Sequence, residues 1–361
     1  QLVETALLNL VNHQTLIATK ASRVCYAAKG DAVMEFGLRR AQGPDAGIYG
    51  ARAAVIAGCV GTSNVLTGQM FGVPVKGTHA HSWIMSFPDE YTAFKTYADL
   101  YPDACILLVD TYDTLRSGVP NAIRVFKEMR EKGIDLKGYG IRLDSGDLAY
   151  LTKKARKMLD DAGFEDAIIS ASSDLDEYLI DSLKTQGAAI TSWGVGTNLI
   201  TSKDNPAFGG VYKLAAVMGD DGTFIPKIKL SENSEKITNP GNKKILRIYD
   251  KASGKIKADL ITLEDEVFTE DQPLTLFDPL ATWKKKRIYN FEARELLVPV
   301  FLHGKRVYDS PSLPEIREYC RQQIDTLWDE VKRFDYPHKY YVDLSDKLWD
   351  IQQCLLRTSQ M

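Results

Sequence analysis

Between about residues 30 and 200, the chain repeats one pattern. A short apolar segment ends in Gly, Asp, Ser, Thr, Arg or His, and a helix-like stretch usually follows it. The seven candidate strand ends are MEFGLRR (34–40), CVGTSN (59–64), VPVKGTHAHS (73–82), ILLVDTYD (106–113), GYGIRLDSGD (138–147), IISASSD (168–174) and ITSWGVGTN (190–198). Because parallel strands need a crossover connection, and a helix is the usual one, these repeated units predict a parallel sheet.

The repeated units predict an irregular (β/α) barrel of about seven parallel strands over residues 1–205. The carboxyl ends of barrel strands share one face, and active sites are built on that face. A doubly wound open sheet is the alternative fold, and its ligands also bind beyond the carboxyl ends of the strands. Either fold would gather the polar residues of the strand ends at one edge of the sheet.

The pattern changes after residue 205. In residues 206–312, β-rich apolar runs alternate with turn-forming groups such as GDDG (219–222) and NPGN (239–242), which favours antiparallel strands. Residues 313–361 carry a mainly helical pattern. We therefore expect a β-rich, α+β second domain that the C-terminal part completes.

Composition excludes several classes of protein. The net charge of -3 provides no general basic field for nucleic acid. No apolar run approaches the roughly 18 to 20 residues that span a bilayer. The five cysteines lie far apart without a CxxC motif, which is typical of free thiols in a reducing compartment. We expect a soluble, cytoplasmic protein that binds neither nucleic acid nor membranes.

Two histidines follow a Gly-Thr turn at the third strand end. They are His79 and His81 in GTHAHSW (77–83). Near neutral pH, histidine can act as an acid, a base or a nucleophile toward phosphorus. Alternatively, neighbouring hydrogen bonds satisfy one or both rings, and the histidines have no chemical role.

Acidic residues gather at two further strand ends. DTYD contains Asp110 and Asp113, and RLDSGD contains Asp144 and Asp147. Carboxylates on one face can bind Mg²⁺, which prefers oxygen ligands and keeps water and substrate phosphate in its coordination shell. Asp113 and Asp147 each precede a helix-like stretch, so a helix N-cap is the alternative role for these two.

The last and first strand ends complete the candidate site. Gly194, Gly196 and Thr197 could form a phosphate cup, because glycines let backbone N–H groups approach a phosphate closely; an ordinary turn is the alternative. In FGLRR, Phe36 could stack on a flat heteroaromatic ring while Arg39 binds a carboxylate or phosphate. A core phenylalanine beside surface arginines is the alternative there.

Taken in order, these motifs resemble the nicotinate phosphoribosyltransferase family, whose fold is that of type II phosphoribosyltransferases. The resemblance runs over essentially the whole chain. It rests on ten strings: QLVETALLNL, FGLRRAQGPDAG, GTSNVLTGQ, GTHAHSW, VDTYDT, IRLDSGDL, SSDLDE, WGVGTNL, KLSENSEKITNPGNKKILRIYD and YPHKYYVDLS. Each string is short, but ten in the family's order are not a coincidence.

The resemblance implies catalytic roles for three residues. His81 matches the histidine that the family phosphorylates with ATP, whereas His79 falls where relatives vary. Asp110 and Asp144 match acidic residues near the ribose and the metal, which makes both of them the candidate Mg²⁺ ligands. ATP enters as a co-substrate.

The resemblance also implies the substrate contacts. Phe36 matches the ring that stacks on the pyridine, and Arg39 and Arg142 match arginines of the pyridine and phosphate site. Ser172 and Ser173 fall where the nicotinamide enzyme has a Gly-Asp pair that contacts ribose. Gly196 and Thr197 match the cup for the 5′-phosphate.

The GTSN motif bears on the choice of substrate. The nicotinamide enzyme has an aspartate near the position of Ser63, where a carboxylate can accept from the amide NH₂ group. Ser63 and Asn64 are uncharged, and an acid there would repel the carboxylate of nicotinate. Nicotinate is therefore favoured over nicotinamide, with nicotinamide phosphoribosyltransferase as the alternative activity.

The resemblance implies the partners as well. The substrates are nicotinate, 5-phosphoribosyl-1-diphosphate and ATP; the products are nicotinate mononucleotide and pyrophosphate; and the assembly is a homodimer. Family members carry a further stretch before QLVET, with a tyrosine that reaches the partner's pyridine site. Because Gln1 opens directly on an amphipathic helical pattern, we expect the natural N-terminal portion to be absent. The sequence assigns no role to residues 229–244.

Two other functions fit parts of the pattern. A barrel aldolase or decarboxylase would need a lysine at a strand tip, and only Lys76 lies near one. A non-catalytic module that binds a pyridine nucleotide is the other alternative. Only the transferase reading would produce pyrophosphate from the diphosphate donor.

Overall fold

The structure is a computed structural model that describes residues 2–232 and 237–358. The chain forms two compact units. Unit 1 comprises Gln1–Gly209 and Leu313–Glu318, and unit 2 comprises Gly210–Ser312 and Tyr319–Met361. Residues 233–236, inside the segment 229–244 and one of the resembling strings, lie outside the described part, as does Gln1.

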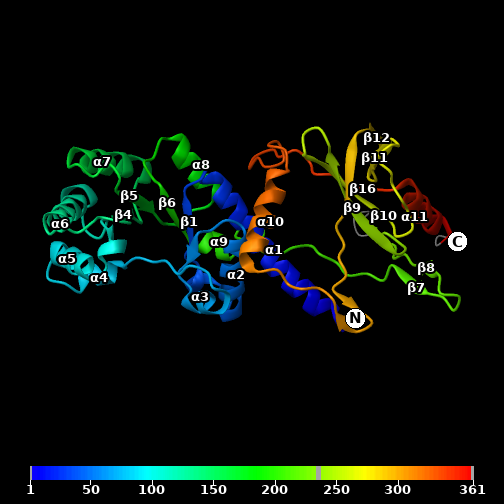
Figure 1. The fold of residues 1–361 in the computed structure, drawn as a ribbon, viewed down its shortest axis with the longest axis horizontal. Coiled ribbons are helices and arrows are strands. Elements are labelled where there is room, and N and C mark those ends of the chain that lie inside the picture. The colour runs from blue at the N-terminus through cyan, green and yellow to red at the C-terminus, as the bar shows by residue number, and fades with distance from the viewer. Residues whose placement is uncertain (1, 233–236, 359–361) are drawn as a thin grey trace. The chain divides into compact units, whose positions relative to one another are not determined.

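Unit 1 alternates short strands with helices (Figure 1). Its strands are β1 (Ala32–Glu35), β2 (Gly61–Thr62), β3 (Ile106–Leu108), β4 (Gly140–Leu143), β5 (Ile168–Ala171) and β6 (Ser192–Val195). Its helices are α1 (Glu4–Ala27), α2 (Pro44–Ile56), α3 (Val65–Phe71), α4 (His81–Met85), α5 (Glu90–Leu100), α6 (Val119–Glu131), α7 (Leu148–Asp161), α8 (Glu177–Thr185) and α9 (Thr197–Ile200). Short helical turns η1 (Leu38–Arg40), η2 (Pro102–Ala104) and η3 (Thr114–Gly118) complete the unit.

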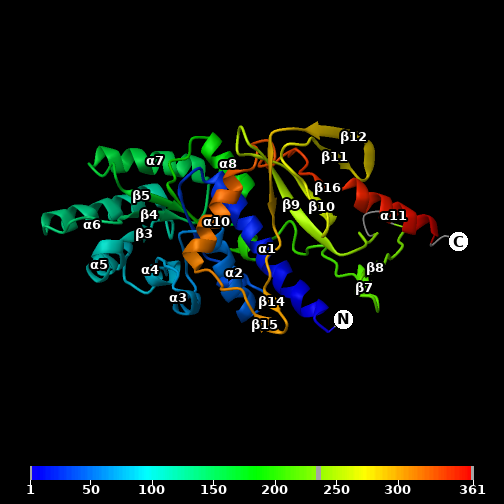
Figure 2. The ribbon, with the colours of Figure 1, turned by 45° about the vertical axis from the view of Figure 1, so that its right-hand side comes forward.

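The six strands of unit 1 form one parallel sheet in the order β2-β1-β6-β5-β4-β3. The first strand of the series therefore pairs with the last, from Ala32 opposite Ser192 to Glu35 opposite Val195. Helices α5, α6 and α7 lie on the outer side of β3, β4 and β5 (Figures 1 and 2). The predicted parallel sheet is thus confirmed, and its carboxyl ends meet at one edge.

The prediction of about seven strands was wrong by one. The segment 73–82 pairs with the sheet only through an isolated bridge between Val75 and Thr62. Pro74 has no N–H group to extend that pairing, and the bridge rests on hydrogen bonds from Thr62 N to Pro74 O and from Lys76 N to Thr62 O. The following residues, which include both candidate histidines, are free of the sheet's backbone pairing.

Buried apolar side chains from the strands and from the inner faces of the helices form the core of unit 1. Leu107, Ile141, Ile169 and Trp193, one from each of four strands, are fully buried. A strand whose two faces are both covered by protein carries a continuous run of apolar residues. The strands of unit 1 therefore stand out in the sequence as short apolar runs. Polar residues begin where the strands end.

Unit 2 is rich in antiparallel strands, as predicted. Its strands are β7 (Ala216–Met218), β8 (Phe224–Pro226), β9 (Lys243–Asp250), β10 (Ile256–Leu263), β11 (Leu274–Asp278), β12 (Ala281–Ile288), β13 (Phe291–Glu295), β14 (Phe301–Leu302), β15 (Lys305–Arg306) and β16 (Val342–Leu344). The largest sheet has the order β13-β9-β10-β16, and β16 is parallel to β10. Helix α11 (Asp346–Thr358) follows β16, and helix α10 (Leu313–Asp325) begins in unit 1 and ends in unit 2.

Within residues 2–232 and 237–358, no helix has both the length and the apolar character needed to cross a lipid bilayer.

Gly118, at the end of η3, makes a tight backbone contact with Val109, the residue after β3. A Cβ atom on Gly118 would overlap the carbonyl group of Val109, although the helical φ of -57° of Gly118 suits any residue. Gly118→Ala should therefore lower the free energy of unfolding by about 3 kcal/mol, despite the higher helix propensity of alanine.

Urea denaturation of Gly118→Ala beside Gly209→Ala tests this prediction. A Cβ atom on Gly209 meets no atom within 4 Å, so this control should stay within about 0.5 kcal/mol of the wild type. Equal stability of the two variants would show that the backbone at Gly118 can shift away from Val109 at little cost in free energy.

Candidate active site

A pocket of about 680 Å³ opens at the carboxyl ends of the strands of unit 1. This volume lies within the range of small-molecule sites. The pocket is lined by Phe36, Arg39, Arg40, Ser63, Gly77, Thr78, Ala80, His81, Ser82, Leu108, Arg142, Asp144, Ser172, Ser173, Asp174, Gly194, Gly196 and Thr197. The lining includes ten of the twelve residues predicted from the sequence, and the exceptions are Asn64 and Asp110.

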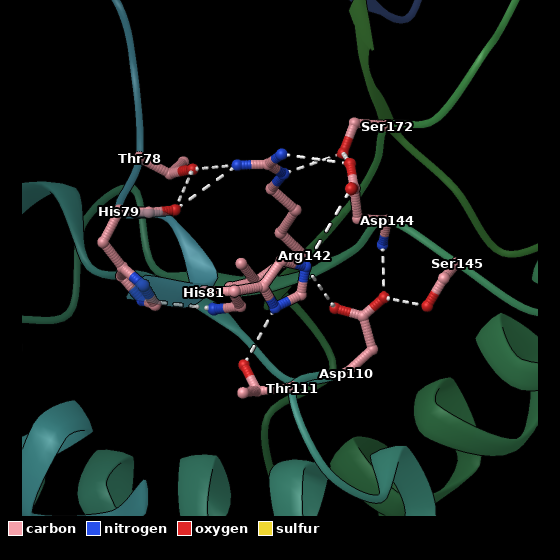
Figure 3. Close-up of polar contacts among 10 residues, drawn as sticks. Thr78, His79, His81, Asp110, Thr111, Arg142, Asp144, Ser145 and Ser172 are labelled. Carbon is pink, nitrogen blue, oxygen red and sulfur yellow. Dashed lines mark hydrogen bonds and ion pairs between the residues drawn. The ribbon is translucent and has the colours of Figure 1, made fainter. Parts of the chain in front are cut away.

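Arg142 at the end of β4 joins three chain segments (Figure 3). Its guanidinium group donates from Nε to Ser172 Oγ at 2.8 Å, from Nη1 to Thr78 Oγ1 at 2.7 Å and from Nη2 to Asp144 Oδ1 at 3.1 Å. A planar guanidinium presents its donors in a fixed fork, so these partners fix its orientation. Ser172 Oγ also donates to Asp144 Oδ1, which closes the network.

Asp110 lies beneath this network. Its side chain is only 3% exposed, and its Oδ2 accepts from Asp144 N at 2.7 Å and from Ser145 Oγ at 2.7 Å. Asp110 therefore holds the loop that carries Asp144, although it does not line the pocket itself. The other oxygen, Oδ1, is buried and has no hydrogen-bond partner in the described chain.

His81 begins helix α4 and faces both carboxylates. Nδ1 lies 3.0 Å from Thr111 Oγ1, while Nε2 lies 4.0 Å from Asp110 Oδ1 and 3.9 Å from Asp144 Oδ2 (Figure 3). The imidazole is 37% exposed, so a ligand in the pocket can reach it. The contact with Thr111 orients the ring and leaves Nε2 at the acidic edge of the pocket.

His79 occupies a different environment from His81. It is buried, its ring packs on Tyr97 at a centroid distance of 4.6 Å, and its Nε2 accepts from Leu108 N at 3.2 Å. Burial lowers the pKa of His79 to about 4, and the positive charge of Arg142 adds to this effect. The neutral ring thus accepts from the backbone of β3 through Nε2, while its buried Nδ1 has no hydrogen-bond partner among the described residues.

Phe36 lies against the end of β6. Its backbone N donates to Val195 O at 2.8 Å, and its ring covers Gly194, where a Cβ atom would lie 2.7 Å from two ring carbons. Gly196 lies against the Phe36 backbone, and a Cβ atom on Gly196 would be crowded at 3.1 Å from Phe36 O. The absence of side chains at these two glycines therefore lets the ring settle at the pocket wall.

Asn64, which was expected to contact the substrate, does not line the pocket. It is 2% exposed and caps helix α3, because its Oδ1 accepts from Thr67 N at 3.2 Å. Its neighbour Ser63 lines the pocket. Asp113 and Asp147 are also helix N-caps, which was the alternative role given for them from the sequence. They accept from the backbone N–H groups of Arg116 and Tyr150, respectively.

Sequence reasoning missed several residues of the site. Thr78 Oγ1 accepts a hydrogen bond from Arg142, and Thr111 orients the ring of His81. Arg40 and Asp174 also line the pocket. Each adjoins a predicted residue at a strand end, so including every polar residue of those loops would have found all four.

The acidic pair suits Mg²⁺ only in part. No cluster of three His, Cys, Asp or Glu side chains able to hold a metal occurs in residues 2–232 and 237–358. Mg²⁺ often binds through one or two carboxylates, with water and substrate phosphate completing its shell. Asp144 Oδ2 and the unpaired Asp110 Oδ1 offer such a pair beside the pocket.

Two sequence-family models match the chain. The model described as "Nicotinate phosphoribosyltransferase (NAPRTase) family" matches residues 32–220. A second, described as "Nicotinate phosphoribosyltransferase C-terminal domain", matches residues 242–352. Together they span the strands of unit 1 and most of unit 2.

Curated relatives carry the same description. The chain is 52% identical to a nicotinate phosphoribosyltransferase of Bacillus subtilis over 349 residues, which cover 97% of this chain and 70% of the relative. It is 37% identical to the Dictyostelium discoideum protein of that name over 404 residues, covering 97% of this chain and 67% of the relative.

Solved structures agree with these relatives. The crystal structure of human nicotinic acid phosphoribosyltransferase superposes with a TM-score of 0.81 at 29% identity, covering 99% of this chain and 77% of that chain. A nicotinate-nucleotide pyrophosphorylase from Pyrococcus furiosus gives a TM-score of 0.67 at 26% identity, covering 90% of this chain and 73% of that chain.

The buried His79 makes the stability of the fold depend on pH. Its pKa is about 4 in the folded chain and near 6.5 when unfolded, so as pH falls below 6.5 the unfolded chain binds a proton that the folded chain does not. This group stabilises the fold fully above pH 6.5, and the contribution is lost between pH 6.5 and pH 4. It should cost about 2 kcal/mol between pH 7 and pH 5.

The variant His79→Gln keeps an acceptor but does not titrate. Urea denaturation at pH 7 and pH 5 should show that the wild type loses about 2 kcal/mol more stability than the variant over this interval. Other titrating groups are common to both proteins and cancel in the comparison. Parallel losses in the two proteins would mean that His79 is protonated in the folded chain as readily as in the unfolded one.

Proposed function

The chain belongs to the nicotinate phosphoribosyltransferase family, and we propose that the pocket of unit 1 is where it transfers phosphoribosyl from 5-phosphoribosyl-1-diphosphate to nicotinate. The products are nicotinate mononucleotide and pyrophosphate, so the activity belongs to NAD salvage. One observation supports this location above the others. The Arg142 network, His81, Phe36 and the Gly196 loop, which are far apart in sequence, surround a single pocket at the strand ends.

The pyridine ring would lie against Phe36. The aromatic face supplies a flat apolar surface for the heterocycle, while Arg39 and Arg40 at the rim can pair with the carboxylate of nicotinate. Ser63 brings no negative charge to this part of the pocket. A nicotinamide ring would gain no carboxylate acceptor from Ser63, so the acid is the better substrate.

The phosphoribosyl group would extend from the pyridine toward β5 and β6. The loop at Gly196 and Thr197 lines the pocket and provides backbone N–H groups for the 5′-phosphate. Ser172, Ser173 and Asp144, which line the pocket, would bind hydroxyl groups of the ribose. Arg142 would hold the negative charge of the donor's phosphates.

Asp110 and Asp144 would bind Mg²⁺ together with the diphosphate of the donor. The bound ion would neutralise the pyrophosphate and favour its departure. The pyridine nitrogen then forms the new bond to C1 of the ribose while the bond from C1 to the pyrophosphate oxygen breaks. The carboxylate of Asp144 would stabilise the positive charge that develops on the sugar, and the fixed orientation of Arg142 and Phe36 would hold the reactants in line.

His81 would couple ATP to this transfer. With Nδ1–H donating to Thr111, the lone pair on Nε2 is free to attack the γ-phosphorus of ATP; the bond to the ADP oxygen breaks, and its electron pair leaves with ADP. Water then hydrolyses the phosphohistidine. This hydrolysis would drive a nearly balanced transfer toward nicotinate mononucleotide.

We further infer that the sheet of unit 1 is an incomplete barrel. Pairing of the first strand with the last is the connection that a barrel requires, and the Val75–Thr62 bridge extends the sheet toward β3. There the side chain of His79, rather than a backbone carbonyl, accepts from Leu108 N. We also propose a homodimer on the basis of the family resemblance.

Turnover measurements test the activity. The chain is incubated with radiolabelled nicotinate, 5-phosphoribosyl-1-diphosphate and Mg²⁺, with and without ATP, and nicotinate mononucleotide and pyrophosphate are measured. Labelled nicotinamide in a parallel reaction should give much less product. Binding of nicotinate mononucleotide without any release of pyrophosphate would instead support a non-catalytic module.

His81→Ala should abolish the coupling to ATP. The fold should survive this change, because the imidazole is partly exposed. The transfer itself should continue without ATP stimulation, and no acid-labile phosphoryl group should form on the chain. His79→Gln serves as the matched control and should keep its coupling. An ATP-dependent rate in His81→Ala equal to that of the wild type would refute the assigned role.

A further inference from the structure

Unit 2 contains a second cavity, of about 690 Å³, that shares no residue with the pocket of unit 1. Its walls come from β10, from the two-stranded sheet of β11 and β12, from the segment 327–341 and from β16. This volume is in the range of small-molecule sites. The function proposed above makes no use of it.

One wall of the cavity is positively charged. Lys286 pairs with Leu276 across the β11–β12 ladder, so Lys284 and Lys286, two residues apart, project on the same face as Leu276. Lys285 also belongs to the cavity lining, but its side chain projects on the other face of the ladder, where its Nζ lies 5.6 Å from the centre of the Phe277 ring. Within the described residues, neither Lys284 nor Lys286 has an ion pair.

The cavity lining also contains a buried acid, Asp343 on β16. It is 4% exposed, and no hydrogen bond or ion pair reaches its carboxylate from the described residues. Its neighbour Asp278, by contrast, pairs with Lys339 at 2.7 Å. Burial and, to a smaller extent, the charge of Asp278 raise the pKa of Asp343 to about 6, and Lys339 opposes them.

An unpaired buried carboxylate is costly, typically by several kcal/mol. A chain that keeps Asp343 at a cavity wall without a donor is therefore suited to a ligand that brings the donor. The flat side chains nearby suit a ring. Trp328 is held by a hydrogen bond from its Nε1 to Ile256 O at 2.8 Å, and Tyr341 packs against His338 at a ring distance of 6.0 Å.

We propose that this cavity binds a purine nucleoside monophosphate whose base donates to Asp343 and whose phosphate pairs with Lys284 and Lys286. Guanine suits the site best, because its N1–H and N2–H donors are adjacent and match the two oxygens of a carboxylate. Adenine places an acceptor beside its amino group, which the carboxylate would repel. Inorganic phosphate would leave Asp343 unpaired, and a simple cation would be repelled by the lysines.

Titration calorimetry of the whole 361-residue chain with GMP tests the proposal. Wild type should bind GMP saturably with a Kd below about 1 mM. Asp343→Asn should weaken binding at least about 10-fold, since hydrogen bonds to a charged group are lost. The pair Lys284→Ala and Lys286→Ala should weaken it several-fold, most strongly at low salt.

Two probes and one variant serve as controls. IMP, which lacks the 2-amino group, should bind more weakly than GMP, and inorganic phosphate more weakly still. Arg287→Ala removes a positive charge from the same strand outside the cavity lining, so it should leave the Kd for GMP unchanged. Removing the unpaired charge of Asp343 should not unfold the chain, and the two lysines are exposed, so the lysine variant tests the site even if Asp343→Asn is unstable.

Phosphoribosyl transfer to nicotinate should be unchanged in all these variants, so failure of this proposal and failure of the assigned activity are distinguishable. Absence of saturable GMP binding overturns the proposal. Binding that persists undiminished in Asp343→Asn and in the lysine variant also overturns it, because GMP would then occupy another site such as the pocket of unit 1.

Discussion

Pairing of β1 with β6 is the constraint on which the candidate active site depends. These strands are more than 150 residues apart in the chain, and four residues of each pair in parallel. The ladder continues one step further through Phe36 N and Val195 O, which brings the Phe36 ring onto Gly194. Without this pairing, the proposed surface for the pyridine and the proposed phosphate loop would not lie on the same wall.

A second constraint comes from charge. Arg142 is 18% exposed and has three side-chain partners, including Asp144, so its charge is compensated before any ligand binds. Asp110 in turn fixes the backbone of Asp144. Groups held this way need little reorganisation when charge develops on a substrate, which is how preorganised sites lower a barrier. Among the described residues, the buried Asp110 Oδ1 has no hydrogen-bond partner, and it lies 4.0 Å from His81 Nε2.

Much of unit 1 could be predicted from the sequence because its signals are local. An apolar run followed by a polar residue marks the carboxyl end of a buried strand, and parallel topology then brings those ends together. The same reasoning found Arg142, Asp144 and His81. It failed for the segment at Val75, because a single bridge and a full strand have the same apolar pattern.

The remaining features depend on long-range contacts that no local pattern encodes. Glu35 follows Met34 on β1 like any strand residue, yet it is fully buried and accepts from Gly37 N and Thr62 Oγ1, so it joins two loops of the site. Burial raises the pKa of this carboxyl, with Thr62 and Gly37 opposing the effect. Asn64 likewise carries no local sign that it is buried and that its side chain caps α3. The direction of a side chain is decided by its neighbours in space.

We propose that one basin at the strand ends of unit 1 holds the pyridine, the ribose and the phosphate together. A crystal structure of the chain with nicotinate mononucleotide would show whether these groups share that basin. We expect the pyridine on the Phe36 ring, its carboxylate near Arg39 or Arg40, and the 5′-phosphate at Gly196 and Thr197. A nucleotide bound away from these residues, with nothing bound beside Arg142, would contradict this proposal.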